Sequence, residues 1–354
     1  MDSHISVKVI TQKDLLAAGC FDVPNAIDVI ENAFLERENG SVVFPDKVVQ
    51  VFDQASQSRI NCLPAAINNV YGMKWVSVFP ENPQRFGLPN LTAVLLLSTL
   101  ETGFPIAFME GTLCSNLRTA SVGAVAAKYL ARQDAQVIGF IGAGEQAKTH
   151  FLTMKAVCPS IRTCYIASRT HSSEQKFVEQ MQKFHPDVEF ICCNSNYSMA
   201  VSDADIIVTA ISGQETLLKA DWIKKGAFYC HVAGLEDEFA VAQKADKIVV
   251  DDWEVVKHRT QTISQMYQQG LLTDSDIHAN LAEIINGSKK GRETQEEFIY
   301  FNSVGLSFLD IALATSMYER VVKKNLGTDV MLQEKSMFEI DDEDGIGEWT
   351  IKYL

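Results

Sequence analysis

The chain has 354 residues, 47% of them hydrophobic and 21% charged, and a formal net charge of −14. This composition is ordinary for a globular protein of one large or two smaller domains, while the negative charge argues against a nucleic-acid or membrane surface. Because no apolar run reaches ~20 residues, no signal-like start is present and eight cysteines lie scattered, the sequence predicts a cytoplasmic protein without a metal site.

The first 130 residues mix helix and strand signals. "VPNAIDVIENAFLEREN" repeats apolar residues at helical spacing, whereas "KVVQVF", "GMKWVSVF", "TAVLLLSTL" and "PIAFMEG" are typical of strands separated by turns. Lys74 interrupts one of these apolar strands, on the same face as Gly72 and Val76. Taken alone, such a lysine is typical of a solvated edge strand.

Strand and helix patterns alternate from residue 131 to about 304. The strands are almost continuously apolar, as in a parallel sheet that helices cover on both faces. We therefore predict an α/β fold, with a Rossmann-type doubly wound domain at 131–304. An α+β domain at 1–130 would be completed by a helix at about 305–330, and residues 331–354 would form an acidic C-terminal tail.

A glycine turn in "VIGFIGAGEQA" follows an apolar strand and precedes a helix. Gly142 permits the tight turn, Gly144 permits close approach of a pyrophosphate, and Ala147 permits strand–helix packing. Glu145 and Gln146 would then present backbone N–H groups at the helix N-terminus to the phosphates. The motif predicts a dinucleotide site, and the alternative is a purely structural turn.

The second strand of this domain ends in "IASRT". An NAD site usually presents an acid to the ribose 2′-hydroxyl at this place, but Ser168, Arg169 and Thr170 offer hydroxyls and a guanidinium. The pattern favours NADP(H) over NAD. The alternative is that Arg169 stacks on the adenine of NAD.

Segments of both domains together resemble the ornithine cyclodeaminase/mu-crystallin family. They include "GMKWVSVFPENP", "TLCSNLRTASVGAVAAKYLA", "GAGEQA", "DADIIVTAIS", "KADKIVVDDWE" and "EEFIYFNSVGLSFLDIALA", and the resemblance covers roughly residues 5–330. The "HVAGLEDEFAVAQKADKIVVDDWE" stretch is most similar to the branch that makes 2,3-diaminopropionate through an N-(2-amino-2-carboxyethyl)-glutamate dehydrogenase. The resemblance implies a homodimer whose dimerisation domain is built from both chain ends.

The resemblance also implies roles for individual residues. Substrate binding would fall to Lys47, Lys74, Arg118 and Val304. Catalysis would fall to Lys74 and an acid at Glu236, with Asp237 as the fallback. Further cofactor contacts would come from Asn90, Arg118, Thr119, Thr209, Val232 and Ser303. Glu110 could order Arg118 through a salt bridge.

These residues predict an NAD(P)-dependent oxidoreductase that acts on the C–N bond of an amino or imino acid. In an opine-type oxidation, an N-substituted glutamate loses hydride from its Cα, and water then releases 2-oxoglutarate and a diamino acid. Lys74 would move the proton, because a dry pocket lowers the pKa of lysine. The alternatives are ornithine-type cyclodeamination, which Glu236 and Asn302 disfavour because they depart from the family pattern, ketimine reduction, and a dinucleotide-binding protein without catalysis.

Overall fold

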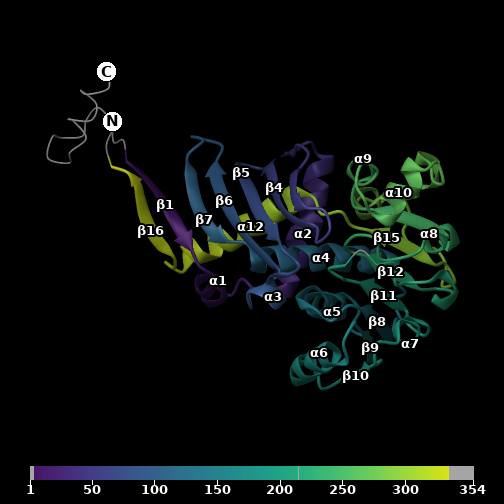
Figure 1. Cartoon of the computed structure of the whole chain (residues 1–354). Helices are drawn as coiled ribbons and strands as arrows, with labels where there is room; N and C mark the ends of the chain where they lie inside the picture. The colour runs from purple at the N-terminus through teal and green to yellow at the C-terminus, as the bar shows by residue number, and fades with distance from the viewer. Residues whose placement is uncertain (1–3, 214, 335–354) are drawn as a thin grey trace.

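The computed structural model describes residues 4–213 and 215–334 and contains two eight-stranded sheets in separate lobes (Figure 1). The first sheet has the order β16-β1-β7-β6-β5-β4-β2, with β3 also paired to β4. Its strands are β1 (Ile5–Ile10), β2 (Val42–Val43), β3 (Val48–Asp53), β4 (Ser58–Ile67), β5 (Val70–Val78), β6 (Leu91–Thr99), β7 (Pro105–Glu110) and β16 (Thr328–Gln333). All pairs are antiparallel except β1 with β7.

Helices from both parts of the chain accompany this sheet: α1 (Gln12–Ala18), α2 (Val23–Glu38), α3 (Asn82–Arg85), α4 (Thr112–Leu130) and α12 (Ser307–Lys323). Asp22 begins α2 by accepting a hydrogen bond from the backbone N–H of Asn25, and Pro24 fits the first turn. α12 packs on β4, β5 and α2, while α4 contacts α2 and α12 as well as α5 of the other lobe. α4 therefore links the two lobes.

The second sheet is parallel throughout, with the order β10-β9-β8-β11-β12-β15-β13-β14, which confirms the predicted Rossmann-type fold. Its strands are β8 (Val137–Ile141), β9 (Thr163–Ala167), β10 (Glu189–Cys192), β11 (Ile206–Thr209), β12 (Phe228–His231), β13 (Lys247–Val250), β14 (Ala279–Asn280) and β15 (Ile299–Asn302). The strand order reverses between β8 and β11, and ligands of such sheets bind at the carboxyl ends beside this switch point.

Short and long helices connect these strands. They are α5 (Glu145–Val157), α6 (His171–Phe184), α7 (Tyr197–Val201), α8 (Phe239–Lys244), α9 (Trp253–Val256), α10 (Thr262–Gln268) and α11 (Leu281–Ile285), with 3-10 turns at Ala220–Trp222 and Asp274–Asp276. Across the sheet, Thr209 pairs with His231, His231 with Asn302, and Asn302 with Val250. The residues that follow these positions therefore meet along one edge.

The predicted acidic tail differs from the structure at its start. Residues 331–333 belong to β16, an exposed edge strand that pairs with β1 through backbone hydrogen bonds and so extends the first sheet. Residues 335–354 lie outside the described part of the chain. Among the described residues, no helix is both long and apolar enough to span a bilayer.

Candidate functional site

Lys74 points into the protein from β5. Its side chain is only 2% exposed, and Gly72 and Val76 on the same strand face are also buried. The ammonium donates to Asp310 Oδ1 at 2.6 Å and to Ser115 Oγ at 3.3 Å. Burial lowers the pKa of Lys74 to about 8, although the neighbouring Asp310 carboxylate opposes this shift. The lysine can therefore both donate and accept a proton near neutral pH.

Asp310, on α12, is shared by two buried cations. Its Oδ1 atom also accepts a hydrogen bond from Arg118 Nε at 2.9 Å. Burial acts to raise the pKa of Asp310, but the charges of Arg118 and Lys74 outweigh it and hold this pKa below its ordinary value. Two cations and one carboxylate leave an excess positive charge in the interior. We refer to Lys74, Arg118 and Asp310 as the buried ion triad.

Arg118 extends from this triad toward the turn that follows β15. Among the described residues, no hydrogen-bond partner is found for its Nη1 and Nη2 atoms. These atoms lie beside Gly305, where an added Cβ would stand 2.9 Å from Nη1 and where φ is +78°. An unpartnered guanidinium edge in the interior is suited to a bidentate carboxylate.

Glu110 does not form the predicted salt bridge with Arg118. Its two carboxylate oxygens accept hydrogen bonds from the backbone N–H groups of Thr112 and Leu113, at 2.6 and 3.1 Å. These donors are otherwise unpaired at the start of α4, and a carboxylate is stabilised there by the helix dipole. Asp310 takes the place of Glu110 as the partner of Arg118.

The turn after β15 carries the predicted Ser303 and Val304. Asp251, one residue beyond β13, accepts hydrogen bonds at its Oδ2 atom from Ser303 Oγ, Val304 N and Gly305 N, at 3.1, 2.8 and 2.9 Å. The carbonyl of Val304 accepts a 3.4 Å hydrogen bond from Lys47 Nζ. The turn thus brings the carboxyl edge of the second sheet against Arg118 and Lys47 of the first lobe.

Lys47 lies immediately before β3 and is partly buried. Burial, with a smaller contribution from the positive charge of Arg259, lowers the pKa of Lys47 to about 7. No carboxylate of the described residues pairs with its ammonium. A bound anion would restore the charged form of this lysine.

The glycine turn has the geometry of a phosphate cradle. Gly142 has φ +109°, and a Cβ there would lie 2.3 Å from the carbonyl oxygen of Ala210. α5 begins after Gly144 without a side-chain cap, so its first N–H groups are open to a ligand. Ala147 is fully buried, and Gln146 Nε2 donates to Asn116 of α4 at 3.0 Å. These residues fit a dinucleotide pyrophosphate.

The end of β9 would face the adenosine half of that ligand. Ser168 is buried and its hydroxyl donates to the carbonyl of Thr170 at 2.9 Å, whereas Arg169 is exposed. Glu174, in the first turn of α6, accepts hydrogen bonds from the backbone N–H groups of Ser168, Asn194 and Ser195, at 2.8–2.9 Å. This carboxylate fixes the loops after β9 and β10.

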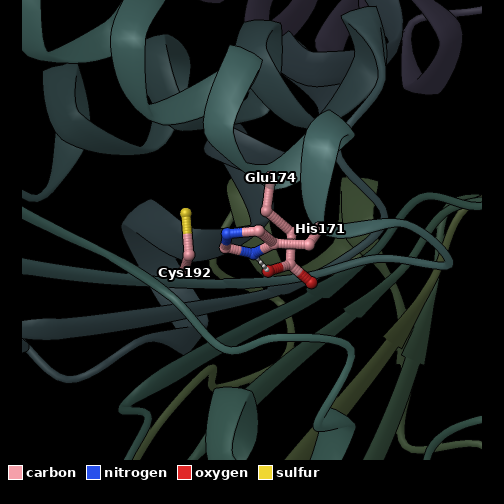
Figure 2. A group of neighbouring side chains, drawn as sticks. All are labelled: His171, Glu174 and Cys192. Carbon is pink, nitrogen blue, oxygen red and sulfur yellow. Dashed lines mark hydrogen bonds and ion pairs between the residues drawn. The ribbon is translucent and has the colours of Figure 1, made fainter.

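The sequence predicts no metal site, yet the fold brings three ligand-type side chains together at this point. Figure 2 shows His171, Glu174 and Cys192, whose ligand atoms lie within 4.8 Å of one another. His171 Nδ1 contacts Glu174 Oε2 at 3.3 Å. Since backbone donors already engage both oxygens of Glu174, the observed contacts give it an anchoring role.

The other predicted cofactor residues are more dispersed. Thr209 is fully buried, and Val232 follows the neighbouring strand end. Thr119 is half-buried on α4 and donates to the carbonyl of Ser115 at 2.8 Å. Asn90 precedes β6 and accepts a hydrogen bond from the backbone of Phe79, within the first lobe. No hydrogen bond within the described part of the chain therefore joins Asn90 to the glycine turn.

Glu236 is fully buried below the strand ends. Its carboxylate accepts hydrogen bonds from Thr209 Oγ1 and from the backbone N–H groups of Ile211 and Ala233, at 2.8, 2.8 and 3.0 Å. A longer contact of 3.4 Å comes from Val232 N. With both oxygens engaged, the geometry argues against the predicted role as substrate-facing acid, because Glu236 instead joins the loops after β11 and β12.

A model of the ornithine cyclodeaminase/mu-crystallin family matches residues 8–325. The chain belongs to this family. N-((2S)-2-amino-2-carboxyethyl)-L-glutamate dehydrogenase of Staphylococcus aureus is 30% identical over 77% of the chain and 82% of the relative. This family member also resembles solved structures of Thermococcus litoralis Δ1-pyrroline-2-carboxylate reductase with NADH and L-proline, and of an archaeal alanine dehydrogenase dimer with NAD. The identities are 32% and 31%, the TM-scores 0.86 and 0.84, and the coverages 92% and 93% of this chain and 100% of each relative.

A Glu236→Gln variant of this cyclodeaminase-family chain separates a structural role of Glu236, as the residue that joins the loops after β11 and β12, from a role as catalytic acid. We expect the free energy of unfolding to fall by about 2 kcal/mol, because the amide N–H₂ faces backbone donors, and kcat to fall less than ~10-fold. Chemical denaturation and steady-state kinetics measure both quantities. Glu238→Gln is a matched control, since Glu238 accepts one backbone hydrogen bond from Ala220. A loss of ~100-fold or more in kcat at unchanged stability would instead support catalysis by Glu236.

Proposed function

We propose that this chain is an NAD(P)-dependent oxidoreductase that acts on the C–N bond of an amino or imino acid, with an opine-type N-substituted glutamate as substrate. The buried ion triad is the observation that carries the proposal. Its excess positive charge and unpartnered guanidinium edge need an anion, and they lie against the turn that follows β15 of the Rossmann-type sheet. The Staphylococcus aureus relative, an N-substituted glutamate dehydrogenase by name, supports this substrate class.

The glycine turn would hold the dinucleotide through the open N–H groups of Glu145 and Gln146. Thr209, Val232 and Ser303, at successive strand ends, would lie along its nicotinamide half. When bound, the nicotinamide supplies or accepts the hydride. Relatives of known structure contain NAD or NADH, which supports this class of cofactor.

The protein's own groups then bind the substrate and move its protons. Arg118 would receive the α-carboxylate on its free edge, with Lys47 as a second cation. Lys74 would take the proton from the substrate nitrogen as an imine forms and would assist the water that adds to the imine carbon. Cleavage of the C–N bond then yields 2-oxoglutarate and a diamino acid.

A substrate screen tests this function. The holoenzyme with N-(2-amino-2-carboxyethyl)glutamate and oxidised cofactor should reduce the cofactor, seen as growth of the NADH band, and release 2-oxoglutarate. Ammonia release from ornithine without net cofactor reduction would support cyclodeamination instead. The pyrroline-carboxylate reductase relative makes cyclic-imine reduction the second candidate, which would appear as NADH oxidation with Δ1-pyrroline-2-carboxylate.

The rate of imine reduction should depend on the protonation of Lys74. The protonated lysine donates to the substrate nitrogen, so kcat should fall as pH rises through about 8, the lowered pKa of this buried lysine. In the oxidative direction the neutral lysine accepts the proton, so kcat should rise through the same range. Initial rates of imine reduction and of amine oxidation, measured from about pH 6 to 10, test the expected fall and the expected rise of kcat. A kcat that is flat with pH in both directions would contradict the role of Lys74.

Arg169 favours a cofactor that carries a 2′-phosphate. It is exposed beyond β9, next to the α6 N-terminus, and no ion-pair partner for it exists among the described residues. Replacing Arg169 by Ala should raise KM for NADPH at least ~10-fold and change KM for NADH less than ~3-fold, because only the 2′-phosphate loses a charged hydrogen bond. Equal changes for both cofactors would support stacking on adenine.

The outer face of the first sheet supports a homodimer. Tyr71, Trp75, Leu96 and Phe108 are exposed on adjacent strands β5, β6 and β7, opposite the helix-covered face. A contiguous apolar face of this kind marks an association surface, and the archaeal relative is described as a dimer. We propose that a second copy covers this face, and light scattering of Trp75→Glu against the native chain would detect dissociation.

A further inference from the structure

A cavity of about 320 Å³ lies between the lobes, beside the proposed α-carboxylate site. Gly305 lines it, and a Cβ added to this glycine would lie 2.9 Å from Arg118 Nη1. Lys47 also lines it, while its ammonium bonds the carbonyl of Val304. The cavity therefore lies next to Arg118, on the other side of Gly305, and Lys47 borders it. Its lining also includes Arg259, in the loop between α9 and α10.

Not every cation around this cavity is available to a ligand. Arg37 also has a buried Nε without an acceptor among the described residues, but it forms ion pairs with buried Asp252 and with Glu38, so its charge is compensated. Glu254 pairs with Lys257. These contacts leave Lys47 and Arg259 as the wall cations to consider.

Arg259 has spare hydrogen-bonding capacity. Its Nη2 atom contacts Asp46 at 3.2 Å, but the Asp46 side chain is 84% exposed, and such surface pairs contribute little. Its Nε atom is buried without a hydrogen-bond partner in the described part of the chain. A buried donor without an acceptor is costly, and an anion inside the cavity would remove that cost.

We propose that this cavity binds a second carboxylate of the substrate, held by Arg259 with Lys47 between the two carboxylate positions. Arg118, Lys47 and Arg259 would form a row of cations that selects amino or imino acids with two carboxylates over those with one. The inference rests on the proposed function for the identity of the substrate, whereas the anion site itself follows from the cavity and its cations. Arg259 acts on specificity and does not contact the reacting C–N bond.

Equilibrium binding tests the site without turnover. Calorimetry with the NAD-loaded enzyme would compare glutarate, with two carboxylates, and butyrate, with one. The native chain should bind glutarate at least ~10-fold more tightly, and Arg259→Ala should remove this difference while leaving butyrate affinity unchanged. Arg259→Lys should keep part of the preference, because it keeps the charge without the planar fork. His258→Ala is the matched control from the same segment, because His258 is exposed and does not line the cavity, and it should behave like the native chain.

Kinetics distinguishes failure of this site from failure of the proposed function. With an N-substituted glutamate, Arg259→Ala should raise KM at least ~10-fold with little change in kcat. If the native chain shows no preference for glutarate, or if Arg259→Ala weakens butyrate equally, the second-carboxylate site is wrong even when turnover is observed. If no amino or imino acid turns over but the Arg259-dependent preference for glutarate is measured, the proposed function fails and the site stands.

Discussion

Replacing Lys74 by Met should reduce turnover by about 10²–10⁴-fold while the affinity for the dinucleotide stays within ~3-fold of the native value. Methionine has a similar length and no charge, so the strand face remains filled. Arg118 and Asp310 remain as a balanced ion pair, and the glycine turn lies in the other lobe. The expected loss is therefore that of one proton-transferring and substrate-binding group. Steady-state kinetics and the quenching of protein fluorescence by NADH measure the two effects.

Lys8→Met provides the control for this substitution. Lys8 belongs to β1 of the same sheet and pairs with the exposed Asp329, so its replacement should leave kcat unchanged. Thermal unfolding of both variants checks that each chain is folded. A folded Lys74→Met enzyme whose kcat/KM stays within ~3-fold of the native value would show that Lys74 takes no part in the chemistry.

The features that could be predicted from the sequence are those that depend on one short, contiguous segment. The Gly142–Gly144 turn follows from one strand–glycine–helix segment, and the structure shows the positive φ and uncapped helix start that the motif requires. The inward direction of Lys74 is a different case. Strand alternation gave its face, and resemblance to the family gave the reason for burying it.

The partners of these residues depend on contacts between distant segments. Asp310 is 236 residues from Lys74 and 192 from Arg118, and Glu110 was the nearer choice for Arg118. One signal was present, because "GLSFLDIALA" carries a single acid in an apolar helical run, just as "GMKWV" carries a single lysine in an apolar strand. Two such isolated opposite charges favour a buried pair, but the sequence does not state which segments meet.

The prediction for Glu236 shows a further limit. The resemblance to the family pointed to an acid at Glu236, yet it could not reveal that four donors converge on that acid. Gln261 was missed altogether, although it accepts from Asn302 and donates to the carbonyls of Ala233 and Ser303. Both side chains join loops that follow different strands, and only the folded sheet brings those loops together.

Replacing Asp310 by Asn should lower the free energy of unfolding by about 3–5 kcal/mol, because removal of one partner leaves buried charge uncompensated. Lys74 and Arg118 would remain in the interior without their shared carboxylate. The pKa of Lys74 should also fall below about 8, since Asp310 is the group that opposes the effect of burial. The pH at which kcat changes would therefore also fall. Urea denaturation and pH–rate profiles measure the two changes.

A double variant shows whether this loss comes from the triad. Asp310→Asn combined with Lys74→Met leaves one buried cation, Arg118, in place of two, so it should be more stable than Asp310→Asn alone. Residues in direct contact typically show interaction energies of about 0.5–3 kcal/mol in such a cycle. If the two substitutions instead add within ~0.5 kcal/mol, Lys74 and Asp310 do not stabilise each other.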